Sequence, residues 1–188
     1  MKEVQAITDT TQIKEVGNLL EKHYSTQLKQ LWSFGLNVAL RISDLLAIKL
    51  ADIKMVDGKY RLVLIEKKTK KKANINLNEN AIAIFKEIKK AYPNNVYLFQ
   101  SMKSKAVTTI KPLGRSYVSS ALKEVGEMLE LHIGTHSMRK TRGYHLYKKT
   151  NDITKVMKCL RHSSEATTLA YIGITQESVD QDFEDLNL

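Results

Sequence analysis

The chain has 188 residues, of which 43% are hydrophobic and 27% charged, proportions typical of a soluble globular domain. It contains no run of about 18 apolar residues, and its first ten residues lack the apolar stretch of a signal peptide, so we expect neither membrane insertion nor secretion. The single cysteine, Cys159, excludes an internal disulfide and favours a reducing, cytoplasmic location.

The net charge of +10 is distributed unevenly along the chain. Residues 176–188 contain five acidic residues and no Lys or Arg, so residues 1–175 carry +15. Such a basic body predicts a polyanionic partner, namely nucleic acid. The alternative is that the charge serves solubility alone.

Apolar residues at helical spacing predict two helices in the first part of the chain, over residues 11–23 and 28–39. A third helix is predicted behind Ser43, a good N-cap residue. Arg41 lies just ahead of it, where a guanidinium and backbone N–H groups could bind a phosphate together. The alternative is an ordinary surface or salt-bridging arginine, for example one paired with Asp44.

Two apolar segments, residues 60–65 and 73–77, predict a β-hairpin. Five lysines, at positions 67, 68, 70, 71 and 72, lie between them. A lysine-rich hairpin tip could reach a DNA groove, and one ammonium group there could protonate a leaving oxygen. The alternative is a solvated loop without a chemical role.

Residues 78–131 are expected to be scaffold. An amphipathic helix that ends near Tyr92 and a second helix from about Ser116 flank a basic loop, residues 101–114, which we expect to contact backbone phosphates.

The tail, residues 174–188, places Val179, Phe183 and Leu186 at i, i+4 and i+7, which predicts a short amphipathic helix. It would either fold back on its own domain or dock in a groove of a neighbouring copy.

The stretch from Thr135 to Tyr171 carries most of the reactive side chains. His136 and Arg139 are spaced i and i+3, so they share a helix face. His162 precedes Tyr171 by nine residues, a spacing that on one continuous helix would point them in opposite directions. The serines after His162 are good N-cap residues, so we predict a helix break there that lets all four groups converge.

A tyrosine hydroxyl is a weak nucleophile because its pKa is about 10. An arginine fork on the phosphate oxygens, with histidines that move protons, would assist its attack on a phosphodiester. The sequence has no CxxC, HExxH, GxxxxGK[ST] or GxGxxG pattern, so we expect no metal or nucleotide cofactor.

Taken in order, ALRISDL, the lysine hairpin, HSMR and LRHSSEATTLAY resemble the catalytic domain of tyrosine recombinases, the phage integrase family. The resemblance covers about residues 10–175. It implies a mainly α fold with a small antiparallel β-sheet (α+β), double-stranded DNA as substrate and assembly with other copies on DNA. It also implies six catalytic residues: Arg41, Lys68, His136, Arg139, His162 and Tyr171.

The resemblance also implies the role of each residue. Tyr171 would attack a DNA phosphate and become joined to the 3′ end, with His136 assisting its proton transfer. Arg41 and Arg139 would hold the non-bridging oxygens, and His162 would hydrogen-bond the phosphate. A hairpin lysine would protonate the departing 5′ oxygen. Lys68, followed by threonine, matches the family position best, and the alternatives are Lys67, Lys70 and Lys72. No metal or ATP would be needed.

The sequence departs from the family pattern in several places. The family often has Gly where Ala39 and Arg161 stand, Glu where Asp44 stands, and a second His where Lys140 stands. It usually adds an N-terminal domain that clamps DNA, and this chain has no room for one. We therefore expect one catalytic domain over residues 1–188, either a minimal recombinase or an excised domain. The alternatives to recombination are DNA relaxation like that of a type IB topoisomerase and a non-catalytic DNA-binding module.

Overall fold

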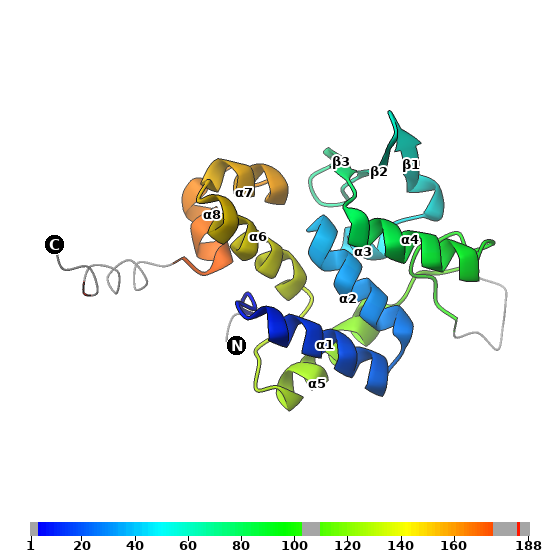
Figure 1. The fold of residues 1–188 in the computed structure, drawn as a ribbon, viewed down its shortest axis with the longest axis horizontal. Helices are drawn as coiled ribbons and strands as arrows, with labels where there is room; N and C mark the ends of the chain where they lie inside the picture. The colour runs from blue at the N-terminus through cyan, green and yellow to red at the C-terminus, as the bar shows by residue number, and fades with distance from the viewer. Residues whose placement is uncertain (1–3, 103–109, 175–183, 185–188) are drawn as a thin grey trace.

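The computed structural model describes residues 4–102, 110–174 and 184, and it is mainly helical with one small sheet (Figure 1). The helices are α1 (Thr10–His23), α2 (Thr26–Val38), α3 (Ile42–Ala47), the 3-10 turn η1 (Leu50–Asp52), α4 (Glu79–Ala91), α5 (Arg115–Met128), α6 (Ser137–Thr150), α7 (Ile153–Leu160) and α8 (Glu165–Ile172). The strands are β1 (Ile53–Val56), β2 (Lys59–Ile65) and β3 (Lys72–Asn76). This architecture confirms the expected α+β fold class.

The sheet is antiparallel in the order β1-β2-β3, with Leu62 of the central strand paired with Ile53 on one side and Ile75 on the other. The sequence predicted β2 and β3 but not β1. Asp57 and Gly58 join β1 to β2 with positive φ angles of 48° and 73°, as in a type I′ hairpin turn. The Asp-Gly pair was therefore the sequence signal for the missed strand.

The main core forms around α2, which packs against α1, α4 and α6. Trp32 of α2 is 1% exposed and donates its indole N–H to the carbonyl of Ile13 on α1 at 3.0 Å. A second apolar cluster joins α6, α7 and α8, and its buried members include Val156, Leu160 and Ile172. This second cluster holds α8 against α6 at one end of the molecule (Figure 1).

The start of α3 differs from the expectation. Ser43 does not cap the helix, because α3 already begins at Ile42 and Arg41 occupies the N-cap position without a side-chain capping bond. The reason is the preceding turn: Ala39 adopts the left-handed conformation (φ 51°) at the end of α2, and Arg41 is then extended. The backbone carbonyl of Arg41 consequently accepts from the N–H groups of Asp44 and Leu45.

The break between α7 and α8 is confirmed. Arg161 ends α7 in the left-handed conformation (φ 53°), and the Ser164 side chain accepts from the Thr167 N–H at the start of α8. The apolar positions of the predicted tail helix lie outside the described residues, so both the tail and the single-domain boundary stay predictions. None of the helices in the described part of the chain has the length and apolar character to span a bilayer.

Candidate active site

The six predicted catalytic residues come from five separate segments of the fold. Arg41 lies between α2 and α3, and Lys68 lies in the turn between β2 and β3. His136 occupies the N-cap position of α6, whose first turn carries Arg139. The remaining two are on either side of the break just described, His162 before α8 and Tyr171 within it.

Tyr171 is surrounded by basic side chains. Its hydroxyl oxygen lies 3.3 Å from Nδ1 of His136, and its ring stands edge-on to the His162 ring with centroids 5.1 Å apart. Nζ of Lys140 lies 5.1 Å from the centroid of the same ring, and Lys140 is only 6% exposed. The break before α8 therefore brings both predicted histidines to the predicted nucleophile.

Both histidines are held neutral at pH 7. Burial, followed by the charges of Arg139, Arg41 and Arg161, lowers the pKa of His162 to about 4. Burial, followed by neighbouring charges of which Arg115 is the largest, also lowers the pKa of His136. A neutral His136 beside a tyrosine hydroxyl can accept its proton.

The tautomer of His162 follows from its neighbours. Nδ1 of His162 lies 3.3 Å from Oγ1 of Thr168, and that hydroxyl donates to the carbonyl of Ser164 at 2.7 Å. Because the hydroxyl has one proton and uses it on the carbonyl, its oxygen accepts from Nδ1. Neutral His162 thus carries its proton on Nδ1 and leaves Nε2 without one.

Arg139 is 2% exposed and holds the ends of two helices in place. Its Nη1 donates to the carbonyl of Ala39 at 2.7 Å, and its Nη2 donates to the carbonyl of Leu160. Both carbonyls lie at the C-terminal ends of helices, α2 and α7, where helix carbonyls lack partners of their own. Two of the five N–H groups of this guanidinium are used in this way.

Arg41 reaches the same site through a buried carboxylate. Glu66, whose side chain is 0% exposed, accepts from Nη1 of Arg41 at 3.2 Å and from Nε of Arg161 at 2.6 Å. Arg161 also donates to the carbonyl of Ala39, the group that accepts from Arg139. The two arginines predicted to share a phosphate, Arg41 and Arg139, are therefore linked through Arg161.

This arrangement corrects the proposed partner of Arg41. The carboxylate paired with Arg41 is Glu66, whereas Asp44 accepts from the backbone N–H of Lys67 at 2.8 Å. Asp44 is turned toward the hairpin because it sits in the first turn of α3, on the buried face of that helix.

The hairpin places its lysines at the surface. Lys67, Lys68 and Lys70 are exposed between the strands, and Lys72 is exposed at the start of β3. The positive φ of 57° at Lys70 turns the chain back toward β3. The choice of Lys68 among these four stays a prediction.

Three neighbours of the site were missed as functional residues: Glu66, Thr168 and Lys140. Glu66 had a sequence signal, because it is the only acid between an apolar strand and a run of lysines. Lys140 stands at a recognised departure from the family pattern. Among the described residues, no three His, Cys, Asp or Glu side chains gather closely enough to hold a metal ion.

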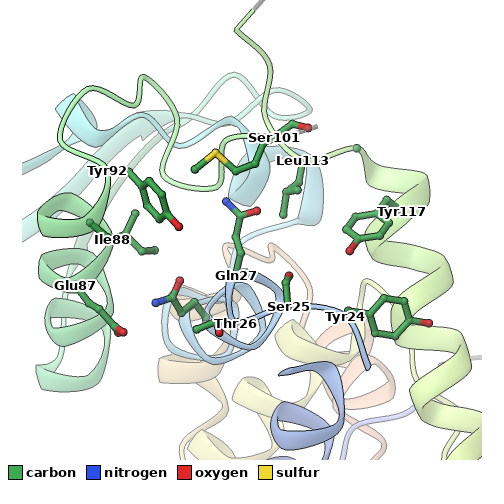
Figure 2. Close-up of a pocket in the computed structure, with 14 residues that line it drawn as sticks. Tyr24, Ser25, Thr26, Gln27, Glu87, Ile88, Tyr92, Ser101, Leu113 and Tyr117 are labelled. Atoms are coloured by element: carbon green, nitrogen blue, oxygen red, sulfur yellow. The ribbon is translucent and has the colours of Figure 1, made fainter. Parts of the chain in front are cut away.

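The cavities of the molecule do not by themselves locate this site. One of about 660 Å³ lies between α2, α4 and α5 and is lined by Tyr24, Gln27, Tyr92 and Tyr117, with none of the six predicted residues (Figure 2). Another, of about 1000 Å³, reaches one side of Tyr171. His136 is exposed and Tyr171 and His162 are partly buried, so part of the site is open to solvent.

Comparison with known proteins identifies the family. The model of the phage integrase family matches residues 2–178. The chain belongs to this family. It is 40% identical over 177 residues to the probable integrase/recombinase YoeC of Bacillus subtilis (strain 168), covering 93% of this chain and 92% of YoeC. It is 28% identical over 145 residues to a tyrosine recombinase of Agathobacter rectalis, covering 73% of this chain and 44% of that protein.

Solved structures share the fold at low sequence identity. XerH site-specific recombinase bound to a palindromic difH substrate matches 96% of this chain with a TM-score of 0.70 and 19% identity. A lambda integrase dimer bound to a COC′ core site matches 94% with a TM-score of 0.69 and 19% identity. The chain spans 53% of that XerH chain and 62% of that lambda integrase chain. The resemblance inferred from the sequence boxes is confirmed.

Proposed function

We propose that this protein is a site-specific DNA recombinase that cleaves and rejoins duplex DNA through a 3′-phosphotyrosine intermediate on Tyr171. The observation that supports this most directly is the 3.3 Å separation between the Tyr171 hydroxyl and Nδ1 of His136, beside linked arginines. Attack on a phosphodiester requires a nucleophile, a base and concentrated positive charge. Membership of the phage integrase family supports the same reaction.

In the proposed cleavage step, the Tyr171 oxygen forms a bond to phosphorus while the bond from phosphorus to the 5′ oxygen breaks. Neutral His136 takes the phenol proton, and a hairpin lysine, in the first instance Lys68, gives a proton to the departing 5′ oxygen. The phosphotyrosine bond retains the energy of the broken phosphodiester. Attack by a 5′ hydroxyl can then rejoin the strand without ATP.

The arginines would bind the non-bridging oxygens of the same phosphate. Arg139 keeps three N–H groups beyond the two that hold backbone carbonyls, and Arg41 uses one of its five on Glu66. A bound phosphate would oppose the arginine charges that lower the pKa of His162. We then expect His162 to take up a proton and to donate from Nε2 to the phosphate.

Duplex DNA and further copies of the chain are the proposed partners. Residues 1–175 carry +15, which favours contact with DNA phosphates. Structural relatives include lambda integrase as a dimer on a core site and as a tetramer bound to a Holliday junction. This chain spans 50% of the tetrameric relative's chain, so the shared fold alone does not show assembly into tetramers. We therefore propose such assembly for this protein.

Covalent capture tests the proposal. The protein is mixed with a pool of nicked duplexes of randomised sequence, in which the short cleaved product diffuses away and prevents rejoining. We expect a protein–DNA adduct that survives SDS, and sequencing the trapped DNA would give the target site. Tyr171→Phe should abolish the adduct and leave DNA binding intact, whereas Tyr92→Phe, an exposed tyrosine at the end of α4, should cleave normally.

Each other outcome favours a different function. The absence of any wild-type adduct would indicate a DNA-binding module. An adduct that persists in Tyr171→Phe would show that the nucleophile is another residue. Relaxation of supercoiled plasmid without strand exchange between two sites would indicate a type IB topoisomerase.

A further inference from the structure

Of the acidic side chains that the structure describes, Glu66 is the only one hydrogen-bonded to arginines in this cluster, and it is completely buried there. Its two carboxylate oxygens accept three hydrogen bonds: from Arg41, from Arg161 and, at 2.6 Å, from the Thr69 hydroxyl. Burial acts to raise the pKa of Glu66, but the bonds from Thr69 and Arg161 and the charges of Arg161 and Arg41 outweigh it, and the pKa is lowered overall. Glu66 is therefore ionised at neutral pH.

The two arginines on Glu66 are bound to different extents. Arg161 donates Nε to Glu66 and Nη2 to the Ala39 carbonyl, so its guanidinium is held by the protein at two points. Arg41 gives Glu66 a single N–H at the longer distance of 3.2 Å. Arg161 thus fixes Glu66, and Glu66 orients Arg41 while leaving most of its donors free for another anion.

Glu66 also sets the balance of charge. Burial lowers the pKa of Arg139, and Arg41 and Arg161 lower it further, so the three guanidiniums repel one another. The guanidiniums of Arg41, Arg139 and Arg161 and the carboxylate of Glu66 together carry a net charge of +2. Lys140 beside the Tyr171 ring adds a further positive charge, and both histidines are neutral at pH 7. The pentavalent transition state of a phosphodiester carries about two negative charges, which this cluster of three arginines and Glu66 is suited to offset.

We infer that Glu66 is a positioning residue, which holds Arg41 at the phosphate and, paired with Arg161, keeps the net charge of the arginine cluster at +2. This inference rests on the proposed cleavage reaction. Neither Glu66 nor Arg161 reacts with DNA, and their effect passes through Arg41. It also explains how an arginine is accommodated at position 161, in a left-handed turn next to two other guanidiniums.

A double-mutant cycle tests the charge balance. Glu66→Gln raises the net charge of the arginine cluster to +3 and releases Arg41. Arg161→Gln lowers that charge to +1 and lets Glu66 draw Arg41 away. We expect single-turnover cleavage to fall about 10–100-fold in each variant, as when one charge-assisted hydrogen bond is lost. The double variant restores +2 and should cleave faster than Glu66→Gln alone. Wild-type rates in the single variants, or additive losses in the double variant, would overturn the inference.

A substrate with sulfur in place of the departing 5′ oxygen distinguishes a defect that acts through Arg41 from one that acts through the hairpin lysine. A thiolate leaves without a proton because the pKa of a thiol is near 8.5, so a defect in the lysine is bypassed. The Glu66→Gln defect should persist on this substrate, because it acts through Arg41, whereas a Lys68→Ala defect should shrink. Full recovery of Glu66→Gln on the sulfur substrate would assign Glu66 to the hairpin alone and refute its role at Arg41.

Two controls complete the experiment. Glu124→Gln makes the same chemical change to a carboxylate that accepts from Tyr24 at 2.5 Å, at the contact of α1 with α5, and should cleave normally. Thermal unfolding of each variant shows the fraction folded at the assay temperature. Adduct formation by the wild type reports on the proposed function separately, so normal adducts together with an unaffected Glu66→Gln would defeat this inference alone.

Discussion

Replacing Arg139 with lysine tests whether one guanidinium both braces the fold and binds the phosphate. Arg139 is 2% exposed, with Nη1 on the Ala39 carbonyl and Nη2 on the Leu160 carbonyl. A lysine ammonium lacks the fork that reaches both groups, so about one charge-assisted hydrogen bond is lost, at a cost of about 1.5–3 kcal/mol. For a chain of this size each kcal/mol lowers Tm by about 2–4 °C, so we expect Tm to fall by about 3–12 °C.

The effect on cleavage should exceed the effect on stability. Removing one donor that stabilises developing negative charge slows a reaction about 10²–10³-fold. Single-turnover cleavage of the nicked substrate, measured well below the Tm of the variant, isolates this loss from unfolding. Near-normal cleavage by Arg139→Lys would refute contact between this guanidinium and the phosphate. Arg142→Lys, on the same helix but lining a hollow beside α1, α2 and α4, is the matched control and should cleave normally.

Three further outcomes are expected. The pKa of His162 is about 4 in the folded protein and 6.5 ordinarily, so the unfolded chain takes up this proton first as the pH falls. The Tm of the wild type should therefore drop between pH 6.5 and 4, and the Tm of His162→Gln should drop less. An equal drop in both proteins would contradict the lowered pKa. Lys68→Ala should cleave slowly when the leaving group is a 5′ oxygen and near normally when it is a 5′ sulfur. If the sulfur substrate restores cleavage to a variant of a neighbouring lysine and not to Lys68→Ala, that neighbour is the proton donor. In Gly143→Ala the new Cβ would lie 2.7 Å from Ile172, so calorimetry should show a loss of about 1–3 kcal/mol and cleavage should fall. In the control Gly114→Ala the new Cβ would meet Ser116 at an ordinary 4.0 Å, so cleavage should stay unchanged.

Local sequence patterns were sufficient for most helices and for the arrangement around Tyr171. The break between His162 and Tyr171 follows from serine capping, which depends on neighbouring residues only. The same rule failed at Ser43, because the left-handed turn at Ala39 starts α3 earlier than the first good capping residue. That turn is stabilised from outside, by Arg139 on the Ala39 carbonyl, 100 residues away in the sequence.

The sequence alone therefore determined the order and types of the reactive residues, and these were enough to indicate the family. The partners of the arginines were decided only by the tertiary structure: Arg161 meets Glu66 across 95 residues, and both Arg139 and Arg161 meet Ala39. Spacing and capping act over a few residues, whereas a buried ion pair forms only where packing brings two distant segments together and excludes water. A carboxylate among lysines thus looked like part of a solvated loop until the fold buried it between two guanidiniums.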